Sequence, residues 1–124
     1  MACDVKRKRG YSNWKSGQDG EVIVSTLYDR SGVRNLASRW RGTAGEIDLV
    51  LHDGAQVVFV EVKRAANFDR AIESLGSRQV ARILQTAEEY LESEPGGSLT
   101  ECRFDLALVD DAGRARIVKN VLAA

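Results

Sequence analysis

The chain has 124 residues, of which 44% are hydrophobic and 29% charged, a composition that fits one globular domain with a sizeable core. Its 18 basic and 18 acidic residues balance, so the net charge supplies no argument for a polyanionic partner. No apolar run approaches the length of a membrane span, and none follows the basic N-terminus as in a secretory signal. The two cysteines lie far apart, so we expect a cytoplasmic protein with free thiols.

The N-terminal part of the chain divides into an arm and the start of a domain. Residues 1–15 are rich in Lys and Arg, and we expect a flexible basic arm that either tracks phosphates or stays solvated. Residues 16–124 are expected to form a single domain. A capping box over residues 16–19 predicts a helix over residues 17–30.

Glu21 stands out in this helix because of its spacing. It shares a line with Val24 and Tyr28, at helical offsets of three and seven, so we expect it to face partly inward. Two roles remain open for its carboxylate. It either contributes to a functional site or complements the positive end of the helix dipole.

The remaining periodicities predict three strands, a second helix and then two further strands, in the overall order αβββαββ. A short helical turn is also expected over residues 71–75. The predicted elements are strands over 33–41, 45–50 and 57–63, a helix over 78–93 capped by Ser77, and strands over 102–110 and 115–121. The apolar positions of the second helix are Val80, Ile83, Leu84, Ala87 and Leu91.

The runs at residues 45–50 and 57–63 predict a β-hairpin with its turn at residues 53–54. This register places Asp48 opposite Phe59 and diagonal to Glu61. Because side chains alternate along each strand, several charged residues then lie on one face of the hairpin. These residues are Glu46, Asp48, Glu61 and Lys63.

Two carboxylates that converge in an apolar strand pair repel each other unless a cation lies between them. Oxygen ligands alone suit Mg²⁺ or Mn²⁺, and a lysine beside them can orient a water or stabilise charge on a phosphate. This chemistry is that of phosphodiester hydrolysis. The alternative is an ion-pair cluster on a solvated sheet face, with Lys63 joining Asp48 and Glu61 and no catalysis.

The segments Gly45-Glu46-Ile47-Asp48 and Glu61-Val62-Lys63 resemble the PD-(D/E)xK nuclease signature. More narrowly, the chain resembles the YraN-like family of small bacterial proteins, predicted endonucleases similar to archaeal Holliday-junction resolvases. The resemblance covers about residues 17–121. Its further matching features are Gly20-Glu21, Trp40-Arg41, Arg78-Gln79, Tyr90-Leu91 and Arg103-Phe104-Asp105.

The resemblance implies an α/β, restriction-endonuclease-like three-layer core, in which a mixed sheet of about five strands is flanked by helices. It implies a metal-dependent DNA endonuclease, with branched or junction DNA as a substrate by analogy. By motif match, Asp48 and Glu61 are expected to bind Mg²⁺ or Mn²⁺ with the backbone carbonyl of Val62. Lys63 is the expected catalytic lysine, and Glu21 the further acidic residue.

We expect DNA as the partner, with no membrane and no small organic cofactor. Four residues are expected to contact nucleic acid, although a solvated helix face is an equal alternative for the last three: Arg64, Arg78, Gln79 and Arg82. Cleavage of both strands would require a symmetric dimer. Two alternatives to the enzyme remain open, a non-catalytic nucleic-acid-binding module on the same fold and a protein-interaction domain that uses a sheet edge.

Two residues outside the hairpin also carry expectations. Trp40 is expected to belong to the core, although a tryptophan can also stack on bases. Asp105 interrupts an apolar strand, so it has either a structural role or a supporting role for the site, and the sequence does not decide between them.

Overall fold

The computed structural model describes residues 20–64, 68 and 75–122. The predicted arm, the capping box and most of the turn predicted over residues 71–75 lie outside these residues. Residues 20–30 are helical, as predicted for that part of the chain. The other elements are β1 (Arg34–Arg41), β2 (Glu46–Asp53), β3 (Gln56–Arg64), α3 (Ser77–Leu91), the short 3₁₀ helix η1 (Gly97–Leu99), β4 (Cys102–Val109) and β5 (Ala115–Val118).

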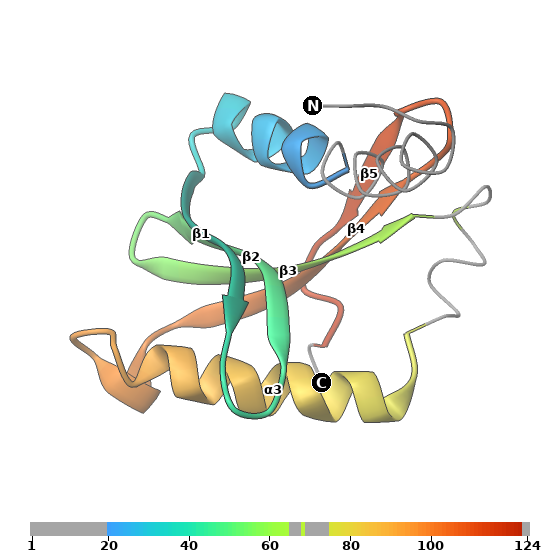
Figure 1. The fold of residues 1–124 in the computed structure, drawn as a ribbon. Coiled ribbons are helices and arrows are strands. Elements are labelled where there is room, and N and C mark those ends of the chain that lie inside the picture. The colour runs from blue at the N-terminus through green and yellow to red at the C-terminus, as the bar shows by residue number, and fades with distance from the viewer. Residues whose placement is uncertain (1–19, 65–67, 69–74, 123–124) are drawn as a thin grey trace, which may run out of the picture.

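Five strands in the described part of the chain form one mixed sheet in the order β1-β2-β3-β4-β5. Strands β1, β2 and β3 form an antiparallel meander, β3 and β4 are parallel, and β4 and β5 are antiparallel. A parallel pair needs a crossover connection, and α3 lies on that connection. Figure 1 shows the helix at residues 20–30 on one side of the sheet and α3 on the other.

The predicted α/β class and mixed sheet are therefore confirmed, and the element order differs in detail. The 3₁₀ helix η1 separates α3 from β4, Phe68 is helical, and β5 ends at Val118. Helix α3 begins at Ser77, with Gly76 as its N-cap, and ends at Leu91, so the predicted cap and the predicted end at residue 93 were wrong. No described helix has the length and apolar character needed to cross a bilayer.

The core has one layer on each side of the sheet. On the side covered by the helix at residues 20–30, Val24 and Tyr28 pack against residues of β2, β3 and β4. On the α3 side, Phe59 stacks on Phe104 with ring centroids 5.2 Å apart and meets the edge of Tyr90 at 5.8 Å. Trp40 packs against this second layer, which confirms its predicted place in the core.

The apolar face of α3 is narrower than predicted. Ile83, Ala87 and Leu91 are buried, but Leu84 leaves 40% of its surface exposed. Thr86 takes the buried position instead, and its hydroxyl donates to the carbonyl of Arg82 at 2.7 Å. A threonine can fill an apolar position in this way because the helix backbone satisfies its hydroxyl.

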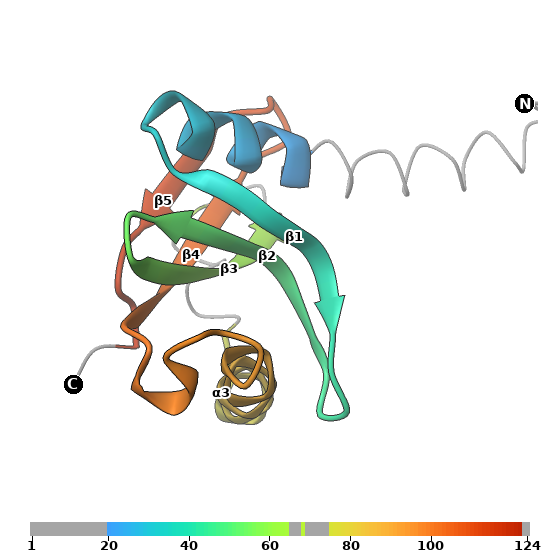
Figure 2. The same cartoon turned by 90° about the vertical axis from the view of Figure 1, so that its left-hand side faces the viewer.

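Strands β1 and β2 extend beyond the rest of the sheet as a two-stranded ribbon, which we call the β1–β2 arm (residues 39–48). Pairing of β2 with β3 ends at Leu49 and Val60, whereas β1 and β2 stay paired as far as Arg41 and Glu46. Figure 2 shows the arm curving towards α3. Its tip is held there because the backbone and hydroxyl of Thr43 both donate to Glu89.

The arm begins at an irregular point. Arg39 has a φ of 54°, a left-handed conformation that non-glycine residues rarely adopt. The ladder between β1 and β2 is paired on either side of Arg39 and Asp48 but not at these two residues. Ile47 and Val50 lie three residues apart and still pack in the same core layer, so the alternation of β2 is interrupted at Asp48.

Candidate active site

The turn of the central hairpin is one residue later than predicted. Asp53 pairs with Gln56, so the two-residue loop is Gly54-Ala55. Gly54 has a φ of 63°, at the first loop position, where two-residue hairpin turns favour glycine. The last pair is Leu49 with Val60. Phe59 pairs with Val50 and not with Asp48 as predicted, and the side chains of Asp48 and Glu61, each one residue beyond the last pair, are hydrogen-bonded to each other.

Asp48 and Glu61 meet where β2 and β3 separate. The backbone N–H of Val62 donates to Oδ2 of Asp48 at 2.8 Å, so the carboxylate takes up a group that the ladder no longer pairs. Burial, a hydrogen bond with Asp48 and the charge of Asp48 together raise the pKa of Glu61 to about 9, although Lys63 and Gln79 oppose the rise. The folded chain therefore favours the protonated form of Glu61 more than the unfolded chain does.

Gln79 of α3 connects the lysine to this carboxyl pair. Lys63 Nζ donates to Oε1 of Gln79 at 2.9 Å, and Nε2 of Gln79 donates to Oε2 of Glu61 at 3.2 Å. The amide thus fixes the positions of an amine and a carboxyl at once. Gln79 was predicted to contact phosphate, and in the structure its side chain contacts Lys63 and Glu61.

Glu21 reaches the same region from the first helix. Its side chain is only 14% exposed, and Nε of Arg39 lies 3.2 Å from Oε1 and 3.3 Å from Oε2. Burial raises the pKa of Glu21, the paired guanidinium lowers it, and the charges of Asp48 and Glu46 raise it further. The expected inward orientation of Glu21 is thus confirmed.

Five predicted site residues therefore come together, whereas the predicted arginines lie outside this set. We call the set Glu21, Asp48, Glu61, Lys63 and Gln79 the carboxylate cluster. Arg82 lines an open groove of about 240 Å³ beside it, with Glu46, Glu61 and Gln79. Arg78 is exposed on α3. Arg64 lies at the end of β3, with Nε 3.9 Å from Oδ1 of Asp111.

The donor atoms of the cluster fit a hard cation. Among the residues that the structure describes, no three His, Cys, Asp or Glu side chains are arranged to hold a metal together. Asp48 and Glu61 supply two carboxylates, so a cation there would need a further ligand such as a backbone oxygen. The N–H of Val62 points to Asp48, and in a strand the carbonyl of the same residue faces the same neighbour. The resulting oxygen-only set suits Mg²⁺ or Mn²⁺.

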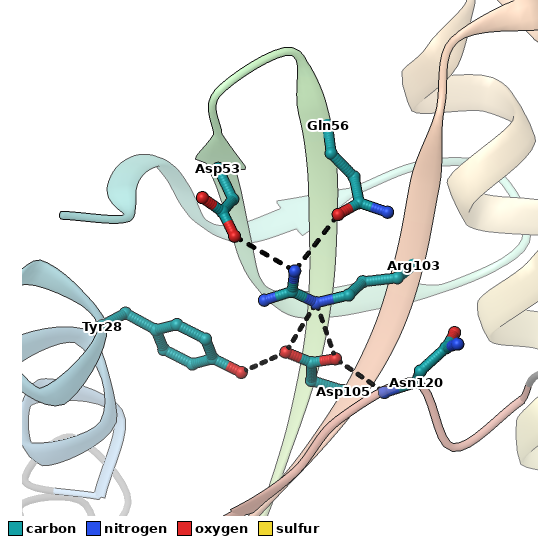
Figure 3. A network of polar contacts seen from close by, with 6 residues as sticks. All are labelled: Tyr28, Asp53, Gln56, Arg103, Asp105 and Asn120. Atoms are coloured by element: carbon teal, nitrogen blue, oxygen red, sulfur yellow. Dashed lines mark hydrogen bonds and ion pairs between the residues drawn. The ribbon is translucent and has the colours of Figure 1, made fainter. Parts of the chain in front are cut away.

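Asp105 belongs to a separate network, which Figure 3 shows. It is only 2% exposed and accepts from the hydroxyl of Tyr28 at 2.7 Å, from Nε of Arg103 at 3.1 Å and from the backbone of Asn120 at 2.9 Å. Arg103 also donates from Nη1 to Asp53 and Gln56, each at 3.1 Å. These bonds join the first helix, the β2–β3 hairpin, β4 and the segment after β5. Of the two roles expected for Asp105, the structure therefore supports the structural one.

Arg39 is the site residue to which sequence analysis gave no role. Its contact with Glu21 depends on a left-handed residue within a strand, and no local pattern signals such a conformation. Because β1 follows the first helix in the chain, a basic residue in this strand could have been considered as a partner for the inward carboxylate of Glu21. The spacing of eighteen residues between Arg39 and Glu21 gives no direct indication of it.

Residues 20–109 match a family model described as "Uncharacterised protein family UPF0102". This range includes the whole carboxylate cluster. A UPF0102 protein of Cereibacter sphaeroides strain KD131 is 47% identical over 115 residues, which cover 93% of this chain and 98% of the relative. A UPF0102 protein of Ruegeria pomeroyi is 50% identical over 112 residues, or 90% of this chain and 91% of the relative. On this evidence the chain belongs to the UPF0102 family, the YraN-like family that its motifs resemble.

Proposed function

We propose that this protein is a metal-dependent endonuclease that hydrolyses phosphodiester bonds in DNA, on a restriction-endonuclease-like fold. The observation that carries the proposal is the approach of two half-buried carboxyl groups, Asp48 and Glu61, which are hydrogen-bonded to each other where β2 and β3 separate. A lysine is held beside the pair through Gln79. An acidic pair can hold a metal ion and an adjacent amine can stabilise charge on a phosphate, so this set suits hydrolysis of a phosphodiester.

Each member of the carboxylate cluster has a distinct role in the proposal. Asp48, Glu61 and the carbonyl of Val62 would hold Mg²⁺ or Mn²⁺, which supplies a more acidic water and neutralises phosphate charge. Lys63 would position the attacking water or stabilise the charge that develops on the phosphate. Glu21 would act through water, and Arg39 would keep its carboxylate ionised and oriented.

The substrate class within DNA rests on the resemblance to junction resolvases, so branched DNA is the first substrate to test. One carboxylate cluster per chain cuts one strand at a time. Cleavage of both strands at a junction would then need two copies arranged symmetrically.

The test is cleavage of labelled junction, flap and linear DNA in the presence of Mn²⁺. Glu61→Gln and Lys63→Ala should each lower the rate at least about a hundred-fold, since each removes a group that acts on the charge of the transition state. Glu88→Gln is the matched control because Glu88 is an exposed carboxylate on α3 outside the cluster. Absence of metal-dependent cutting, or equal cutting by all variants, refutes the proposal.

A non-catalytic nucleic-acid-binding module is the second candidate. It is favoured by the fact that Lys63, Gln79, Glu61 and Asp48 already form a continuous chain of hydrogen bonds, which can serve as a lock between β3 and α3. In that case, the protein binds DNA with an affinity that falls steeply with salt but does not cut it.

A further inference from the structure

A second groove is distinct from the one that Arg82 lines. It has a volume of about 200 Å³ and runs between the first helix and the edge strand β1. Figure 2 shows the helix lying alongside β1. The groove is lined by Glu21, Val22, Ser25, Thr26, Asn35 and Ser38.

Two serine hydroxyls of this groove are joined through the side-chain amide of Asn35. Nδ2 of Asn35 donates to the hydroxyl oxygens of Ser25 and Ser38, each at 3.2 Å. Each serine therefore keeps its own proton for another acceptor. Val22, which is 60% exposed, adds an apolar surface beside these hydroxyls. Hydroxyl donors next to a small apolar surface suit a sugar–phosphate chain.

The charges along β1 favour the same ligand. Two of its three arginines, Arg39 and Arg41, are paired with Glu21 and Glu46, whereas Arg34 is exposed at its start. The one carboxylate in the groove, Glu21, is paired with Arg39 and so presents little net charge to a phosphate. From end to end β1 spans roughly 25 Å, the length of several nucleotides of one strand.

The position of the groove links it to the carboxylate cluster, because Glu21 belongs to both. We propose that the groove binds the sugar–phosphate backbone of one nucleic-acid strand, with Ser25 and Ser38 donating to phosphate oxygens and Arg34 pairing with a further phosphate. This inference rests on the proposed function for its ligand, nucleic acid, but it does not require cleavage. It places a binding surface on β1, away from the α3 residues predicted from sequence.

The test is binding of a fluorescent 20-nucleotide single strand and of the matching duplex, measured by anisotropy without metal over a range of salt. Arg34→Gln should weaken binding several-fold and reduce the slope of log affinity against log salt by about 0.7 to 0.9, the share of one phosphate. The double variant Ser25→Ala/Ser38→Ala should weaken binding about five-fold for each lost hydrogen bond.

The matched control is Arg116→Gln, because Arg116 is an exposed arginine on β5, at the opposite edge of the sheet. It should leave both affinity and salt slope unchanged, and thermal melting of every variant confirms the fold. Equal effects of Arg34→Gln and Arg116→Gln, or no effect of either, overturn the inference.

The outcomes also separate the groove from the nuclease. Binding that depends on Arg34 without metal-dependent cutting supports the groove and refutes the nuclease. Cutting by the wild-type chain together with binding that depends on Arg78 and Arg82 but not on Arg34 refutes the groove alone. A wild-type chain that binds neither probe overturns the inference.

Discussion

Replacing Glu61 by glutamine should change how stability depends on pH. The pKa of Glu61 is raised from 4.5 to about 9 in the folded chain, so the folded state binds the proton more tightly than the unfolded state between these two values. The contribution of protonated Glu61 to the stability of the folded state is complete below about pH 4.5 and is lost as pH rises through about 9. The free energy of unfolding of the wild-type chain should therefore fall across this window.

The size of the effect follows from the pKa difference. One pKa unit corresponds to about 1.4 kcal/mol, so the interval from 4.5 to about 9 sets a ceiling of about 6 kcal/mol. Solvent reaches part of the Glu61 side chain, which is half-buried, and screening lowers the expectation to about 3 kcal/mol. Gln cannot lose a proton, so Glu61→Gln should remove this part of the pH dependence.

The assay is urea unfolding of wild type and Glu61→Gln in metal-free buffer at several pH values from 5 to 9. The free energy of unfolding of the wild type, minus that of the variant, should fall by about 3 kcal/mol over this range. Glu88→Gln, at an exposed position on α3, corrects for the loss of a carboxylate in general. If wild type and Glu61→Gln have parallel pH profiles, Glu61 is not held protonated and the reasoning about the pair is wrong.

Two further predictions follow from the same structure. A cation at Asp48 and Glu61 must displace the proton of Glu61, so the apparent Kd for Mn²⁺, measured by calorimetry, should fall about ten-fold per pH unit between pH 6 and 8. A pH-independent Kd contradicts this. Tyr28→Phe removes a donor to the buried carboxylate of Asp105 and should lower the free energy of urea unfolding by about 1.5–3 kcal/mol. A loss below about 0.5 kcal/mol would show that the remaining donors satisfy Asp105.

The carboxylate cluster could be predicted from sequence to the extent that it depends on periodicity. A turn displaced by one residue moves the register by two, so Asp48 and Glu61 stay on one face although their predicted partners were wrong. The helical line through Glu21 likewise depends only on the 3.6-residue repeat. The predicted approach of Asp48 to Glu61 and the inward side of Glu21 agree with the structure, although the alternation of β2 is interrupted at Asp48.

The parts that depend on long-range contact could not be predicted. Tyr28 and Asp105 are 77 residues apart, and nothing local to either indicates the other. The left-handed conformation of Arg39 arises in the strand that leads into the arm, where tertiary packing overrides the preference of a non-glycine residue. Leu84 matched the helical pattern and was still exposed, because the sheet covers a narrower stripe of α3 than the pattern suggests.

The outer edge of β1 has a consequence for how copies of this protein can associate. A bulge at residues 35–37 and the left-handed Arg39 leave only a short regular stretch between them. At the other edge, β5 has only four residues. Neither edge offers a long, regular row of backbone donors and acceptors, so strand addition between chains, and the aggregation that it causes, is disfavoured. If the proposed function requires two chains, we expect them to meet through helices or loops.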